Sequence, residues 1–106
     1  MDYTIQITVM PGTAGDFVYT PAVLHIQLTD TVTWTSELPF SLEFQEGSPF
    51  DAQQVFSTNY ARTKMFTSIQ HQVTGPRGQY HYAVAVWSEA DQRIYLDAAC
   101  PRISVN

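Results

Sequence analysis

Apolar and polar residues alternate along most of this chain, and this period of two constrains its fold more than any other feature. In the first segment Ile5, Ile7 and Val9 alternate with threonine and glutamine. Successive side chains of a β-strand point to opposite faces, so such a segment predicts a strand with one buried and one solvated face. The same signal predicts strands over residues 23–28, 31–35, 40–44, 65–73, 79–87, 93–97 and 102–105.

Short strands at this density predict an all-β fold. Such strands, joined by turns, are typical of a Greek-key antiparallel β-sandwich, here with seven to eight strands. The segment 46–64 interrupts the alternation, and we expect it to hold one short helix capped by Ser48 or Asp51. A chain of 106 residues has the length of one domain, so we expect residues 1–106 to form a single sandwich.

Charge and apolar content bear on the classes of partner. The net charge is −5 and the five basic residues are dispersed, which argues against nucleic-acid binding. No apolar run approaches the ~20 residues that a membrane-spanning helix needs, and the N-terminus lacks the features of a signal peptide. We therefore expect a soluble protein, either cytoplasmic or a mature exported domain with an added Met. The single cysteine, Cys100, excludes an intrachain disulfide.

Three short motifs occur in order along the chain. Residues 29–34 read TDTVTW, residues 39–42 read PFSL, and residues 78–84 read GQYHYAV. In these motifs the chain resembles the cupredoxin-like β-sandwiches, the group that includes plastocyanin and azurin. In the copper proteins of that group the second motif often reads Pro-His-Asn-Val, and the third leads to a ligand cysteine. The resemblance implies a cupredoxin-like fold for most of the chain.

The resemblance also implies that the copper site has been lost. Type 1 copper is bound by two imidazoles and a thiolate, with a weak axial thioether. The first ligand histidine falls on Phe40 and the ligand cysteine on Val84, and neither residue binds metal. The other histidine and the methionine belong to a loop before the last strand, but residues 83–105 contain neither residue type. We therefore expect no cofactor, and we expect Phe40 to seal the end of the sandwich by packing.

The histidines leave one alternative metal reading open. By alternation His25 and His81 face outward, whereas His71 is in phase with Ile69 and Val73 and is expected to be partly buried. A non-classical site could be formed by His71, His81 and Cys100 if their strands converge. The alternative is that the histidines are structural and that Cys100 packs near the start of a strand.

Aromatic residues supply the candidates for partner binding. Alternation over 93–97, with Ile94 and Leu96 inward, predicts that Tyr95 faces outward beside Trp87 on a terminal hairpin. Tyr60 and Phe50 fall in the loop region. Exposed aromatic side chains are enriched at binding surfaces. The alternative for Trp87 is that it packs under the 46–64 loop.

These observations favour a non-catalytic, metal-free binding or assembly module. The terminal hairpin or an edge strand would contact a protein partner or a second copy, since residues 80–87 carry few charges that would prevent strand pairing. The alternatives are a carbohydrate-binding sandwich that stacks sugars on Trp87 and Tyr95, a divergent metal or redox protein, and a structural domain of a longer chain. No nucleophile-elbow motif or paired carboxylates indicate an enzyme.

Overall fold

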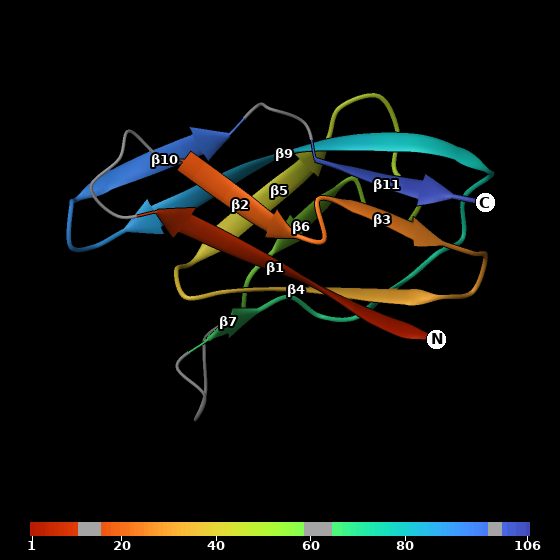
Figure 1. Ribbon diagram of the computed structural model, residues 1–106, viewed down its shortest axis with the longest axis horizontal. Helices are drawn as coiled ribbons and strands as arrows, with labels where there is room; N and C mark the ends of the chain where they lie inside the picture. Colours follow the sequence, from red (N-terminus) through yellow and green to blue (C-terminus); the bar gives the residue numbers. More distant parts are fainter. Residues whose placement is uncertain (11–15, 59–64, 98–100) are drawn as a thin grey trace.

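A computed structural model describes residues 1–10, 16–58, 65–97 and 101–106, and these ranges hold eleven strands and no helix (Figure 1). The strands are β1 (Asp2–Met10), β2 (Asp16–Thr20), β3 (Val23–Ile26), β4 (Thr31–Ser36), β5 (Phe40–Phe44), β6 (Gln54–Phe56), β7 (Phe66–Thr67), β8 (His71–Gln72), β9 (Gly78–Ser88), β10 (Arg93–Asp97) and β11 (Arg102–Val105).

The strands form two sheets packed face to face. The first sheet has the order β2-β1-β4-β7, with β8 also pairing with β4. The second has the order β3-β11-β9-β5-β6, with β10 also pairing with β9. The long strand β9 crosses much of the molecule (Figure 1), and it is paired with β5 on one side and with β11 and β10 in succession on the other. This confirms the predicted all-β sandwich.

Most strand pairs are antiparallel as predicted, but both sheets are mixed because each also contains a parallel pair. β1 pairs in parallel with β4, and β11 pairs in parallel with β3. The parallel partners are far apart in the sequence, so no short turn fixes their relative direction. The count of seven to eight strands is also too low, because the predicted strand over 65–73 is divided into β7 and β8, and two short pairing segments, β2 and β6, were not expected.

Alternation correctly predicts the inward faces of the longer strands. Along β4 the residues Val32 and Trp34 are buried, and along β9 the residues Tyr82, Val84 and Val86 are buried. Each large apolar side chain removed from water stabilises the fold by about 1.5–3 kcal/mol. The core therefore follows directly from the period of two in the sequence.

Trp34 lies at the centre of an aromatic cluster in the core. Its ring packs edge to face against Tyr82 at 5.8 Å and Phe50 at 5.7 Å between centroids. His71, buried on β8, also packs against Trp34 at 6.3 Å and against Phe50 at 5.8 Å. Such aromatic pairs each contribute about 0.5–1.5 kcal/mol beyond area burial. The cluster joins the two sheets, because Trp34 comes from the first and Tyr82 from the second.

The structure around Phe50 contradicts two predictions, the exposure of Phe50 and a helix near it. Phe50 was expected in an exposed loop position, but its side chain is buried in the aromatic cluster. The described part of the 46–64 segment, residues 46–58, contains no helix. Pro49 accepts hydrogen bonds from Thr74 and Gly75 at 2.9 Å, and a Cβ on Gly75 would lie 3.0 Å from the Pro49 Cα. These tertiary contacts hold the backbone in a series of bends, and no helix follows Ser48 or Asp51 in the described residues.

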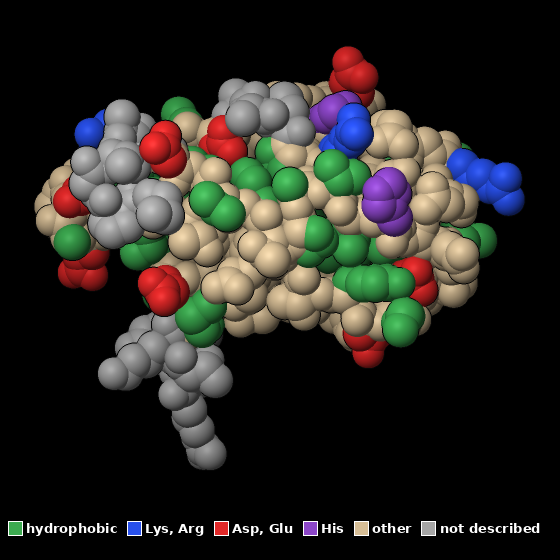
Figure 2. Space-filling view, viewed as in Figure 1, with side chains coloured by type: hydrophobic (Ala, Val, Ile, Leu, Met, Phe, Trp, Pro, Cys, Tyr) green, Lys and Arg blue, Asp and Glu red, His purple; other side chains and the backbone are tan. Residues whose placement is uncertain are grey.

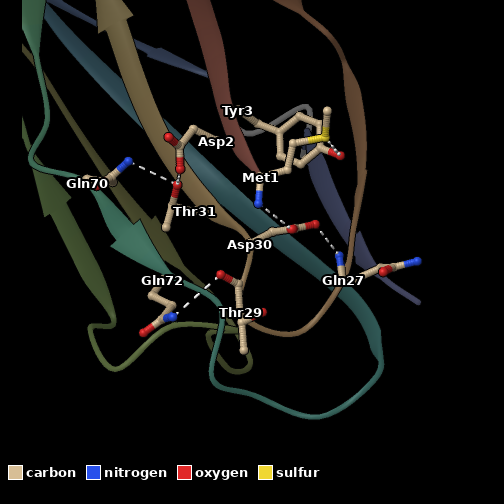
Figure 3. A network of polar contacts seen from close by, with 9 residues as sticks. All are labelled: Met1, Asp2, Tyr3, Gln27, Thr29, Asp30, Thr31, Gln70 and Gln72. Carbon is tan, nitrogen blue, oxygen red and sulfur yellow. Dashed lines mark hydrogen bonds and ion pairs between the residues drawn. The ribbon is translucent and has the colours of Figure 1, made fainter.

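The end of the sandwich that carries Met1 is closed by polar contacts (Figure 3). The Asp30 carboxylate accepts hydrogen bonds from the Gln27 main-chain N–H at 2.8 Å and from the Met1 ammonium group at 3.1 Å. These two donors hold the pKa of Asp30 below its usual value. Beside them the Gln70 amide donates to the Thr31 hydroxyl at 3.0 Å. The contacts connect β1, β4 and the segment leading into β8.

Burial raises the pKa of Tyr82 to about 12, although the nearby Trp34 indole offsets part of this effect. The unfolded chain loses the phenol proton at about pH 10, so the stability that Tyr82 contributes is lost as pH rises from about 10 to about 12. We expect the free energy of unfolding of wild type, relative to Tyr82→Phe, to fall by about 1.4 kcal/mol between pH 9 and pH 11. Urea unfolding followed by tryptophan fluorescence at both pH values measures it. Parallel curves for the two proteins would contradict it.

Burial against the aromatic rings lowers the pKa of His71, and the negative charge of Asp51 opposes this only in part. The unfolded chain binds the imidazole proton near pH 6.5. The stability contributed by neutral His71 is therefore present above that pH and is lost as pH falls towards the lower folded-state pKa. We expect wild type to lose stability between about pH 7 and pH 5 more steeply than His71→Gln. His25→Gln, at an exposed position, is the matched control and should keep the wild-type slope.

Candidate functional site

The two described metal candidates, His71 and His81, lie in different sheets. His71 lies on β8 in the first sheet, where it is buried as expected, and His81 lies on β9 in the second sheet with an exposed side chain. Cys100 falls outside the described residues. Among residues 1–10, 16–58, 65–97 and 101–106, no group of three His, Cys, Asp or Glu side chains could hold a metal ion.

The positions that correspond to copper ligands are filled by core side chains. Phe40 and Val84 are both buried, and they lie on the adjacent strands β5 and β9, where Phe40 pairs with Val86 and Leu42 with Val84. The main-chain N–H of Phe40 donates to the Ser57 hydroxyl at 3.0 Å, which fixes the start of β5. The prediction that Phe40 packs in the core is confirmed.

The two aromatic residues of the terminal hairpin face opposite ways. Trp87 is outward and 38% exposed, as predicted, and no loop covers it in the described structure. Tyr95 was predicted to face outward, but it is only 9% exposed. Its hydroxyl donates to the Asp91 carboxylate at 2.5 Å, which raises the pKa of Tyr95 above its usual value, and the Arg93 guanidinium carbon lies 4.8 Å from its ring centroid. Tyr95 therefore offers no stacking surface to a partner.

The pairing of β10 with β9 explains the wrong prediction for Tyr95. Residues directly opposite on neighbouring strands share a face of the sheet. Tyr95 is opposite the inward-facing Val86, whereas Ile94 and Leu96 are opposite the outward-facing Trp87 and Ala85. In β10 either Ile94 and Leu96 or Tyr95 could face inward, and each choice would bury apolar groups. The sequence of β10 alone therefore does not decide which residues face the core. Tyr60, the fourth predicted partner residue, falls outside the described residues.

The outward side chains of β5, β6, β9 and β10 form one continuous surface, which we call the outer face. Four large hydrophobic side chains are exposed on it, namely Phe56 (61%), Trp87 (38%), Ile94 (59%) and Leu96 (76%). Sequence reasoning found Trp87 and missed the other three. On the same face as Trp87, β9 carries two small residues, Ala83 and Ala85. This outward run of small residues is the sequence signal that could have indicated the surface.

The outer face is hollowed along its middle. Ser41 and Ala85 are cross-strand partners, and with Ala83 they form a floor of small side chains. Phe56 on β6 and Leu96 on β10 stand on either side of this floor and line a recess of about 320 Å³. A second recess of about 190 Å³ lies beside it, between Trp87, Ile94 and Pro39. Together they make a shallow trough, which we call the outer-face trough.

The charged residues of the trough are acidic. The larger recess is lined by Glu43 and Asp97, and no Lys or Arg lines either recess among the described residues. Glu43 accepts a hydrogen bond from the Gln54 amide at 3.0 Å, and Asp97 accepts one from the Tyr19 hydroxyl at 2.6 Å. Glu43 lies on the outward face of β5, whereas Asp97 lies opposite the inward-facing Val84 and directs its carboxylate to Tyr19 of the first sheet.

The distribution of basic side chains bears on nucleic-acid binding. On the face shown in Figure 2 the blue lysine and arginine side chains lie at separate places and form no basic patch. Within the described ranges, the structure contains no helix that is long and apolar enough to cross a membrane.

No protein-family model matches this sequence, and no curated protein matches it significantly. Solved structures are similar over nearly the whole chain. A cysteine protease inhibitor from Entamoeba histolytica has a TM-score of 0.52 at 11% identity, with 99% of this chain and 97% of that chain covered. A pseudoazurin from Sinorhizobium meliloti has a TM-score of 0.50 at 19% identity, with 100% of this chain and 75% of that chain covered.

A plastocyanin from Dryopteris crassirhizoma has a TM-score of 0.50 at 13% identity, and 97% of this chain and 99% of that chain are covered. Pseudoazurin and plastocyanin are cupredoxins, so these similarities confirm the resemblance that the sequence motifs indicated. At such identities they establish the fold alone. The protein has the cupredoxin-like sandwich fold, and its described residues contain no metal-binding group.

Proposed function

We propose that this protein is a metal-free, non-catalytic binding module whose outer-face trough holds an apolar segment of another protein. The observation that carries the proposal is the concentration of Phe56, Trp87, Ile94 and Leu96 on one sheet face around a floor of small residues. Contiguous exposed apolar patches on small soluble domains mark interaction sites more often than chance. Tryptophan and phenylalanine are also enriched at protein interfaces.

The acidic charge around the trough favours one kind of bound peptide segment. Glu43 and Asp97 line the larger recess, and the chain carries a net charge of −5. A bound segment with lysine or arginine beside its apolar residues would pair with the outward Glu43 carboxylate, and charge complementarity of this kind speeds and orients association. Two copies stacked through their outer faces would bring like charges together. The trough therefore favours a different, basic partner.

The comparisons support a binding role for such a sandwich. The Entamoeba histolytica protein, which matches over almost the whole of both chains, is named as a cysteine protease inhibitor, a role that involves contact with another protein. The electron-transfer reading has no ligand set behind it, because Phe40 and Val84 occupy the corresponding positions in the core. The carbohydrate reading needs Trp87 and Tyr95 on one surface, and Tyr95 is buried.

A peptide library tests the trough. We expect panning of a random peptide display library against the wild-type protein to enrich apolar peptides that carry lysine or arginine. Synthetic versions should bind Phe56→Asp and Ala85→Gln at least about tenfold more weakly, because one change removes an apolar wall and the other fills the floor. Fluorescence anisotropy measures both affinities. Binding should also weaken with added salt, since the rim carboxylates are exposed or half-exposed.

The matched control is Val18→Asp, which changes an outward, exposed apolar residue on β2 of the other sheet. It should bind the peptides as wild type does. Peptides that bind Phe56→Asp and wild type equally, or an enriched set that is acidic, would contradict the proposal.

A metal assay tests the other half of the proposal. After incubation with excess Cu(II) or Zn(II) and removal of unbound ions, we expect no stoichiometric metal by mass spectrometry and no change in melting temperature on adding chelator. Retention of one copper or zinc ion per chain would contradict the metal-free reading. It would direct mutagenesis to His71, His81 and Cys100.

A further inference from the structure

A second interaction surface lies along the free edge of β10. This strand pairs with β9 through the register Arg93–Ser88 to Asp97–Val84. On its other side no strand among the described residues pairs with it. The surface differs from the outer-face trough because it consists of main-chain groups at the margin of the second sheet.

The direction of those main-chain groups follows from β9. The Trp87 N–H donates to the Pro39 carbonyl on the β5 side, and the Tyr82 N–H donates to the Pro101 carbonyl on the opposite side. Successive residues of a strand direct their N–H and C=O groups to alternate sides. Val86 therefore faces β10 and pairs with Tyr95, so the main-chain groups of Ile94 and Leu96 point away from β9 to the open edge.

Within the part of the chain that the structure describes, this edge lacks the usual protection against strand pairing. Natural edge strands are blunted by proline, by bulges or by charged residues in their middle. β10 reads RIYLD and carries its charges only at its two ends, while Ile94 and Leu96 between them are exposed. In the described structure no hydrogen bond to the outward main-chain groups of these two residues is present.

The sequence of β10 is complementary to itself in the antiparallel direction. With Tyr95 opposite Tyr95 of the second copy, Arg93 lies opposite Asp97 of the second copy and Ile94 opposite Leu96 of the second copy. The Ile94–Leu96 pairs are then the hydrogen-bonded pairs of the ladder, because their main-chain groups face the partner. Opposite charges directly across a sheet stabilise pairing, whereas a parallel register would place Arg93 against Arg93.

We propose that two copies of this chain associate through antiparallel pairing of β10, in the register Arg93 to Asp97, and that their second sheets join into one. The Asp97 carboxylate has partners within its own chain, among them the Tyr19 hydroxyl, and the arginine of the other copy would add to them. The two-fold axis is perpendicular to the sheet, so the two outer faces lie on the same side. This inference goes beyond the proposed function and does not depend on it.

Charge exchange tests the register. Sedimentation velocity over a range of micromolar concentrations should show a wild-type dimer, and Arg93→Asp and Asp97→Arg should each weaken dimerisation by about tenfold or more, because each places like charges opposite one another. An equimolar mixture of the two variants should recover a dimer, since the two carboxylates on β10 of one variant then face the two guanidinium groups on β10 of the other. Tyr19→Phe controls for the lost hydrogen bond to Asp97 and should dimerise as wild type does.

A second variant tests the backbone itself. Leu96→Pro removes an N–H that points to the open edge and that β9 does not need, and proline is tolerated at such edge positions. We expect this variant to keep its circular dichroism spectrum and to be monomeric, whereas Leu96→Thr, which keeps the N–H, should still dimerise. A monomeric wild type, or a folded Leu96→Pro protein that remains dimeric, would overturn the inference. A monomer that binds the basic peptides would overturn it and leave the proposed function standing.

Discussion

The pairing of β9 with its neighbours is the constraint on which the rest of the structure depends. β5 lies on one side, and β11 and β10 share the other. This pairing fixes which residues of β5 and β10 face the core and which face solvent. It buries Tyr82, Val84 and Val86 against the first sheet and places Ala83, Ala85 and Trp87 outward. The core and the outer-face trough are therefore two sides of one arrangement of strands.

Most of the fold could be predicted from the sequence, because strands with one buried face repeat with a period of two. The inward faces of β4, β5 and β9 follow this rule. It failed for β10, where Ile94, Tyr95 and Leu96 are all apolar and only pairing with β9 decides between the phases. The parallel strand pairs and the bent path around Pro49 arise from contacts between distant segments, which local patterns do not encode.

The candidate site could be predicted only in part, for a related reason. Trp87 stands out in the sequence as a large outward aromatic residue. Phe56, Ile94 and Leu96 read as ordinary strand residues, and their exposure depends on the register of short strands. Phe50 reads as a loop aromatic, yet it enters the cluster around Trp34. Burial of an aromatic residue near a turn depends on space left by residues far away in the chain.

Successive residues of β9 face the core and the trough in turn, and this alternation affects how such a protein can evolve. Ala83 and Ala85 face the trough, while the side chains of Val84 and Val86 are buried in the core, so substitutions at the two alanines change the shape of the trough and leave the core residues of β9 in place. Recognition can therefore diverge between descendants of one sequence while thermodynamic stability stays constant.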